Sequence, residues 1–372
     1  MQLSELTPVT RGYHMSLNLP NDADLSEMIA AMTRMLKTGA RMYQHLAQVT
    51  INRFGREGEM TVRYGLRAYG QWRGEEMRQA HHALGLETNM LTLTKCWDNA
   101  SAYIIKDTSH AEGFFSPSDV KVDVHVCPLA EVWKEAGFFH FGHVYCDEIH
   151  HAATSTYHPD GNVVIPQNMM KGDDHCHFQF VMPATAQPQN LGEPTELGMK
   201  LANYYRSASE LEDAWHVLIR SDRLFGLFFY SLASAILTRH GNDVGQDIIN
   251  EAMRSFGEER GSILRREHLE NGIEISVDNF IDNHDLPTKF AWEYNKSFSS
   301  TSADLAIDIL YTPHDDAWSD YGASNFSDLF YETSYPAMAN GYDPRINATC
   351  QSVEIDGRKM MRLSLSSHEL LT

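Results

Sequence analysis

The sequence predicts an α+β fold in which two tandem copies of one domain each place helices ahead of an antiparallel sheet. Three observations carry this prediction: an internal repeat, amphipathic helical segments at the start of the copies, and alternating strand patterns at their ends. The length of 372 residues also fits about two domains of ordinary size.

The repeat is visible when the chain is aligned with itself. Residues 68–74 correspond to 255–261, and residues 43–55 correspond to 229–241. Further along, six structural residues recur at a constant offset: Pro128, Trp133, Gly137, Tyr157, Pro159 and Gly172 match Pro313, Trp318, Gly322, Tyr342, Pro344 and Gly357, each 185 positions later. We therefore expect two copies, 25–185 and 205–367, arranged as a pseudo-twofold pair. A linker from Pro183 through Pro188 to Pro194 would join them, since prolines favour an extended chain.

The first copy is expected to open with a helix through residues 25–32. Apolar residues recur there every three or four positions, and Asn21 or Asp22 can cap the helix. Residues 122–127 and 174–180 alternate in polarity and predict strands near the end of the copy.

The composition excludes several classes of function. A net charge of −20 repels phosphate backbones and anionic lipids, so we expect neither nucleic acid nor membrane as a partner. The start of the chain lacks a basic segment followed by an apolar one, which predicts a cytoplasmic protein. The near-apolar stretch 224–237 is too short to span a bilayer and is expected to be a helix buried against the other copy. Without a secretion signal, the five cysteines are expected to be thiols or metal ligands rather than disulfides.

The second copy has lost the chemically active residues of the first. The replacements are Thr312 for Cys127, Tyr331 for Cys146, Asp343 for His158, Lys359 for Asp174, Met361 for Cys176 and Arg362 for His177. Joint loss of three thiols indicates one shared site in the first copy, with the second copy a degenerate partner. The alternative is ordinary drift among buried cysteines.

Cys127 is placed to start a helix. Pro128 follows it at the first helical position, and Gly137 lies just past the predicted end. In the second copy Thr312 keeps the capping function without the sulfur. A thiol at a helix N-terminus has a lowered pKa, so we expect a nucleophile or metal ligand, the alternative being a merely tolerated cap.

Cys176 lies on a predicted strand whose alternation places Asp174, Cys176, Phe178 and Phe180 on the core face. Asp174 beside the thiol could be a general base, a ligand or a partner for a substrate amine. His175 and His177 point the other way and are interpreted as ordinary surface residues.

Cys146 precedes His150 by one helical turn, a spacing that can bind zinc but also fits a solvated helix face. Cys127, Cys146 and Cys176 together are therefore an alternative zinc site. The sequence has no Walker loop, dinucleotide fingerprint, HExxH or GxSxG motif, which argues against those common enzyme classes.

These motifs resemble those of a known family. The helix Cys127-Pro128-x-x-x-x-Trp133, the pair Tyr145-Cys146, and the segment 172–178 with Gly-Asp-Asp-x-Cys-x-Phe are similar to the L-2-amino-thiazoline-4-carboxylic acid hydrolase family. The late strand also resembles 4-vinyl-reductase-type small-molecule-binding domains.

The resemblance implies hydrolytic opening of a small cyclic amidine or thiazoline C=N system. In one mechanism Cys127 or Cys176 attacks the ring carbon and Asp174 holds or protonates the ring nitrogen. In the other, zinc bound by Cys127, Cys146 and Cys176 activates a water. The alternative to an enzyme is a small-molecule-binding or sensory module. The expected partner is a small-molecule substrate, and assembly into a homo-oligomer stays open.

Overall fold

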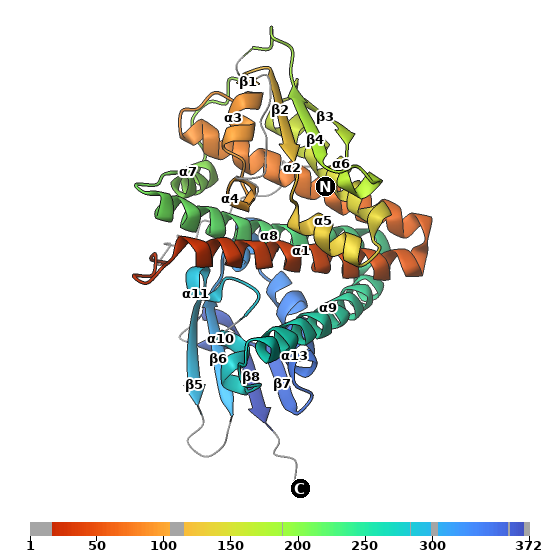
Figure 1. Ribbon diagram of the computed structural model, residues 1–372, viewed down its shortest axis with the longest axis vertical. Helices are drawn as coiled ribbons and strands as arrows, with labels where there is room; N and C mark the ends of the chain where they lie inside the picture. Colours follow the sequence, from red (N-terminus) through yellow and green to blue (C-terminus); the bar gives the residue numbers. More distant parts are fainter. Residues whose placement is uncertain are drawn as a thin grey trace.

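The computed structural model describes residues 17–104, 115–187, 189–282, 284–298, 304–355 and 358–367. Within these ranges the chain is an α+β protein with two separate four-stranded antiparallel sheets. The sheets lie at opposite ends of the molecule, and long helices cross between them (Figure 1). Residues 1–16, Pro188 and Gly357, which entered the sequence arguments, lie outside the described residues.

The N-terminal half is mostly helical before its sheet. Its elements are α1 (Leu25–Phe54), α2 (Arg56–Ala83), α3 (Met90–Lys95), α4 (Ser101–Ile104), β1 (Phe115–Ser116), β2 (Asp119–Val124), α5 (Pro128–Glu135), α6 (Phe139–Tyr157), β3 (Asn162–Gln167), the short 3-10 helix η2 (Met169–Lys171) and β4 (Cys176–Val181). Helix α1 begins where the sequence predicted, but its cap is Asp24 rather than Asn21 or Asp22. The Asp24 carboxylate accepts the backbone N–H groups of Ser26 and Glu27.

The C-terminal half repeats this order after a short connection. Its elements are α7 (Glu196–Ala202), the 3-10 helix η3 (Asn203–Tyr205), α8 (Glu210–His240), α9 (Asn242–Glu270), α10 (Val277–Asp282), α11 (Thr288–Ala291), β5 (Glu293–Phe298), β6 (Leu305–Tyr311), α12 (Pro313–Asp320), α13 (Phe326–Tyr342), β7 (Ile346–Ile355) and β8 (Arg358–Ser367). The strand orders are β1-β2-β4-β3 and β5-β6-β8-β7. The two sheets therefore have the same topology.

Equivalent polar contacts recur in the two halves. His81 of α2 is hydrogen bonded to the hydroxyl of Tyr157 at 2.8 Å, and His268 of α9 is hydrogen bonded to Tyr342 at 2.8 Å. All four side chains lie at matching positions of the repeat. The matching residues thus make matching contacts, as expected for scaffold positions.

The glycines of the repeated helical motif allow close helix packing. A Cβ atom at Gly70 would lie 2.5 Å from a backbone carbonyl of α6, and one at Gly74 would lie 2.3 Å from another. In the second half, Cβ atoms at Gly257 and Gly261 would lie 2.2 and 2.0 Å from carbonyls of α13. Because a side chain would collide with backbone at each position, glycine is needed there.

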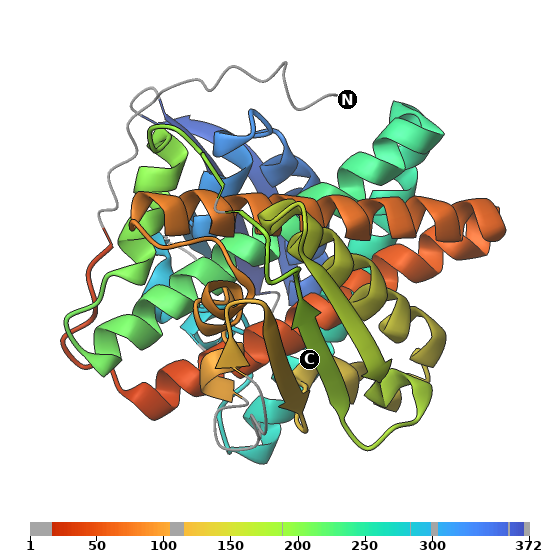
Figure 2. The ribbon, with the colours of Figure 1, turned by 90° about the horizontal axis from the view of Figure 1, so that it is seen from above.

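The apolar stretch 224–237 packs against the N-terminal half, as the sequence predicted. The ring of Phe228 in α8 stacks on Tyr69 of α2 with centroids 4.7 Å apart, and on Tyr43 of α1 at 5.8 Å. Viewed from above, the first sheet lies over the long helices α1, α2 and α8 (Figure 2). Among the helices of the described ranges, none is both long and apolar enough to cross a bilayer.

A buried charged pair also joins the halves. Arg223 of α8 donates to the carboxylate of Glu76 in α2 at 2.8 Å, and the hydroxyl of Tyr321 donates to the same carboxylate at 2.6 Å. Both charged side chains are buried, so losing Arg223 would leave the carboxylate of Glu76 without this cation.

Candidate functional site

A cavity of about 110 Å³ lies between the inner face of the first sheet and the helices beneath it. Strands β2 and β4, the start of α5, helix α6 and the segment after α3 contribute to its lining. Most of the lining is apolar or aromatic, including Leu36, Trp97, Trp133, Tyr145 and Phe178. A cavity of this size has room only for a small molecule.

The three predicted thiols all line this cavity. Cys127 comes from the start of α5, Cys146 from α6 and Cys176 from the first position of β4. Cys176 is buried and the other two are half-buried. The fold thus brings together three cysteines that are separated by up to about fifty positions in the sequence.

Cys127 is the N-cap of α5, as predicted, and Pro128 follows it. The expected lowering of its pKa is wrong. Burial raises the pKa of the Cys127 thiol to about 11, although the N–H groups of Ala130 and Leu129 act in the opposite direction. Removal of water from the thiolate outweighs the positive end of a helix of eight residues.

The other two thiols are also held in their protonated form. Burial raises the pKa of Cys146 well above its usual range, and the neighbouring Cys127 and Cys176 raise it further. Burial raises the pKa of Cys176 as well, while the backbone N–H of Met169, 3.3 Å from its Sγ, acts in the opposite direction. A base is therefore needed to activate any of these thiols at neutral pH.

The thiols do not fit a zinc site. Zinc–sulfur bonds of ~2.3 Å place the sulfurs of a tetrahedral site ~3.8 Å apart. In the part of the chain that the structure describes, Cys127, Cys146 and Cys176 do not form a group whose ligand atoms all lie within 4.8 Å of one another. The three sulfurs are therefore too far apart to share one tetrahedral zinc ion.

Asp174 lies outside the cavity, which corrects the expectation that it faces the core. Its side chain is 88% exposed and pairs with His175 at 2.7 Å. Strand β4 begins only at Cys176, so the alternation of a strand does not extend back to Asp174. His175 and His177 lie on the face opposite Cys176, as predicted.

Sequence reasoning missed Arg73, the charged side chain among the described lining residues. Its Nε donates to Asp98 at 2.9 Å, and Nη2 donates to the other carboxylate oxygen. Arg73 matches Arg260 in the sequence, and Arg260 makes the same pairing with Asp285, so comparison of the two halves assigns Arg73 to the scaffold. Arg73 can be recognised as a candidate site residue only from its buried position beside the cavity, which the structure shows and the sequence does not.

His150 also faces the cavity rather than solvent. Its Nδ1 donates to the carbonyl of Cys146 at 2.8 Å, because a carbonyl can only accept. This leaves Nε2 unprotonated. Burial lowers the pKa of His150 to about 4, so the imidazole is neutral at pH 7 and can accept a proton.

The matching positions of the second half carry hydrogen-bonded polar side chains. Tyr331, at the position of Cys146, is hydrogen bonded to His314 at 2.6 Å. The other ring nitrogen of His314 lies 3.3 Å from Asp222, and both side chains are fully buried. Thr312, at the position of Cys127, caps α12. This half therefore has a packed network where the first half has a thiol-lined cavity.

Comparison of the chain with known proteins found one related family. No curated protein and no solved structure matches the chain. A family model matches residues 35–180, a range that contains the three thiols, Arg73 and His150. The resemblance seen in the sequence is thus confirmed: over residues 35–180 the chain matches the L-2-amino-thiazoline-4-carboxylic acid hydrolase family.

Proposed function

We propose that this protein is a hydrolase that opens a small cyclic amidine or thiazoline C=N substrate in the thiol-lined cavity of its N-terminal half. The observation that carries the proposal is the meeting of three thiols, a neutral imidazole and a guanidinium in one small cavity inside the range that matches the family. The apolar lining would exclude bulk water and polymeric substrates.

Arg73 would bind a carboxylate on the substrate. Two of its three nitrogens, Nε and Nη2, donate to Asp98, and the third, Nη1, would donate to the substrate. The rings of Trp97 and Tyr69 lie 5.1 and 5.3 Å from the guanidinium carbon and hold it in place. A ligand carboxylate would then fix the ring relative to the thiols.

The chemical step would use a thiol as nucleophile and His150 as base. His150 Nε2 takes the proton of Cys127 or Cys176, and the sulfur adds to the ring carbon of the C=N group while the ring nitrogen gains a proton. The carbon–sulfur bond of the ring then breaks, the amino group on the same carbon loses a proton, and the ring sulfur gains one. This leaves an open-chain thiol joined to the enzyme as an isothiourea. Water adds across the C=N bond of the isothiourea. The new hydroxyl then loses its proton to the departing enzyme sulfur as the C=O bond forms, which restores the thiol and releases a carbamoyl compound.

His150 replaces Asp174 in this scheme. The carboxylate of Asp174 is on the solvent side of the sheet, whereas His150 lines the cavity together with Cys146. The thiols are protonated at neutral pH and need a base, and His150 is neutral there and can accept their proton.

We further propose that residues 25–185 form the active copy of a tandem duplication and residues 205–367 the degenerate copy, as a pseudo-twofold pair. The matching strand orders and the recurring hydrogen bonds of His81 and His268 support this relationship. The degenerate copy would act as scaffold, since α8 packs against the helices of the first half.

The test is product formation from 2-amino-thiazoline-4-carboxylate by the full-length protein, followed by chromatography of the carbamoyl product. Stopping the reaction in acid and measuring intact mass would detect the isothiourea on the enzyme. Turnover together with the adduct supports the proposal. Stable binding of the compound without turnover would instead identify a small-molecule-binding or sensory module.

A further inference from the structure

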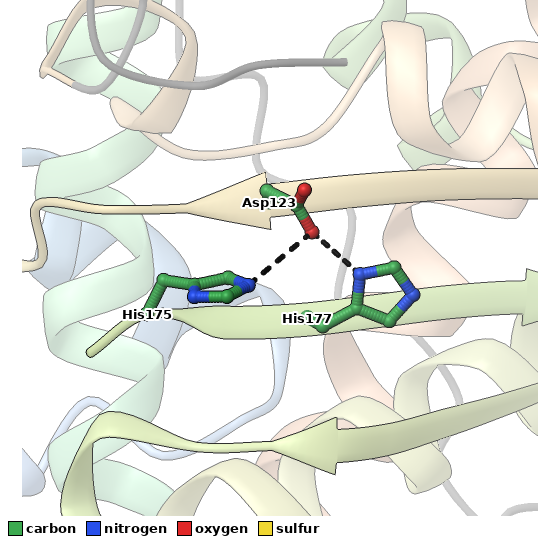
Figure 3. A group of neighbouring side chains, drawn as sticks. All are labelled: Asp123, His175 and His177. Carbon is green, nitrogen blue, oxygen red and sulfur yellow. Dashed lines mark hydrogen bonds and ion pairs between the residues drawn. The ribbon is translucent and has the colours of Figure 1, made fainter. Parts of the chain in front are cut away.

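A second cluster of chemically active side chains lies on the outer face of the first sheet. Asp123 of β2 is paired in register with His177 of β4, and His175 lies just before that strand. Figure 3 shows the carboxylate of Asp123 between the two imidazole rings. We propose that these three residues bind a divalent transition-metal cation such as Zn²⁺, at a site separate from the thiol-lined cavity and independent of the hydrolase proposal.

The distances suit such an ion. Nδ1 of His177 lies 2.5 Å and Nε2 of His175 lies 3.9 Å from Oδ1 of Asp123, and one ligand atom from each residue lies within 4.8 Å of the others. Metal–ligand bonds of ~2.0–2.1 Å place tetrahedral ligands ~3.3 Å apart, so small side-chain rotations would complete the site. Imidazole with carboxylate favours zinc, cobalt, nickel or copper over calcium or magnesium.

The exposure of the cluster leaves room for a metal to enter. The side chains of His175, Asp123 and His177 are 18%, 24% and 25% exposed, so they are held by the sheet but reachable from water. A water molecule could take the remaining coordination position.

Asp174 gives His175 the orientation that a ligand needs. Its carboxylate pairs with Nδ1 of His175 at 2.7 Å, which leaves Nε2 directed toward Asp123. A carboxylate behind a metal-binding imidazole is the usual outer-shell arrangement, because it fixes the tautomer and the ring direction. The ring of His125 stacks on His175 with centroids 5.0 Å apart and restricts it further.

The second sheet has an ion pair at the positions that correspond to this cluster. Asp308 occupies the position of Asp123, and its cross-strand neighbour is Arg362, whose Nε donates to it at 2.6 Å. A permanent cation therefore neutralises the carboxylate in that sheet. In the first sheet two histidines stand where the second has Arg362 and Met360, and a bound metal would supply the positive charge that arginine supplies there.

A metal ion bound to this cluster would stabilise the strands that carry two of the thiols. Asp123 is four residues before Cys127, and His175 and His177 flank Cys176. A metal bound to all three side chains would fasten β2 to β4 behind the cavity. It would thus hold two of the thiols in place without touching them.

The experiment is titration of Zn²⁺ and of Co²⁺ into untagged, chelator-treated full-length protein, followed by calorimetry, thermal unfolding and absorbance. We expect one ion per chain, a higher Tm, and cobalt ligand-field bands without the near-ultraviolet charge-transfer band of a thiolate ligand. His177→Ala should weaken binding at least about tenfold, in the range seen when metal ligands or their supports are lost.

His177→Arg is the matched variant, because it recreates the pairing seen between Arg362 and Asp308 and should fold while losing the ion. His151→Ala, which alters an exposed histidine of α6, is the control and should bind as the wild type does. Absence of binding by the wild type, binding that His177→Arg retains, or a thiolate band that Cys127→Ser removes would each overturn the proposal.

Discussion

The indole of Trp133 donates a hydrogen bond to the backbone carbonyl of Ala40 at 3.1 Å, which ties α5 to α1 beneath the cavity. The second half has the same joint, in which Trp318 donates to Gly226 at 2.8 Å. The supports of the cavity are therefore retained where the thiols are not. This contrast separates the scaffold residues from those that are candidates for chemistry.

Replacing the thiols should stop the reaction without unfolding the protein. We expect Cys127→Ser and Cys176→Ala each to abolish product formation, because each removes a sulfur that lines the cavity. Cys350→Ala is the control, since Cys350 lies in β7 of the other sheet. Product chromatography and circular dichroism measure both effects. Near wild-type turnover by Cys127→Ser would rule out Cys127 as the nucleophile.

The pH profile should identify the base. With the pKa of His150 lowered to about 4, kcat/KM should stay level from pH 5 to 9 and fall about tenfold per unit below pH 4. The free energy of unfolding should also decrease as the pH falls from about 6.5 to 4. The reason is that His150 binds a proton more tightly in the unfolded chain than in the folded protein. Circular dichroism across this range separates the two effects.

If the nucleophile were instead a thiolate formed without help from His150, the pH profile would differ. Since the pKa of Cys127 is about 11, its rate would rise about tenfold per pH unit between pH 6 and 10. His150→Gln should lower kcat by about 100-fold or more if the imidazole is the base. Such a rise in the wild type, with full activity in His150→Gln, would contradict the role assigned to His150.

Arg73 should discriminate substrates by their carboxylate. Arg73→Lys is expected to raise KM for 2-amino-thiazoline-4-carboxylate while changing little for the analogue without the carboxylate, because lysine lacks the planar donor set. The ratio of kcat/KM between the two compounds is the measurement. An equal loss for both would show that Arg73 only supports the fold through Asp98.

Close packing of α2 on α6 should make Gly74 intolerant of a methyl group. Gly74→Ala places a Cβ 2.3 Å from the carbonyl of Ala153 and should lower the free energy of unfolding by ~1–3 kcal/mol. Gln71→Ala on the exposed side of the same helix is the control. Denaturant titration compares them, and equal stability of the two variants would show that the helices can move apart at little cost.

The N-terminal half should need the C-terminal half for its solubility and activity. Residues 25–185 expressed alone would expose Tyr43, Tyr69 and the carboxylate of Glu76, which now face α8. We expect this fragment to be poorly soluble or inactive, and addition of residues 205–367 should restore some activity. A soluble and fully active fragment would show that the second half is dispensable.

The sequence alone determined the α+β class, the start of α1, the N-cap position of Cys127 and the burial of residues 224–237 against the first half. These features depend on local spacing and on apolar patterns, which neighbouring residues specify directly. The same patterns placed His175 and His177 on the face opposite Cys176. The family resemblance also came from the sequence, since its motifs are short and contiguous.

Only the tertiary structure decided the electrostatics and the composition of the cavity. The helix dipole predicted an acidic Cys127, but the enclosing side chains remove water from the thiolate and raise its pKa. Arg73 and His150 reach the cavity because α2 and α6 pack beneath the sheet, while Asp174 leaves the inner face because β4 begins two residues later. Burial and strand limits depend on contacts between distant segments, so one-dimensional spacing could not supply them.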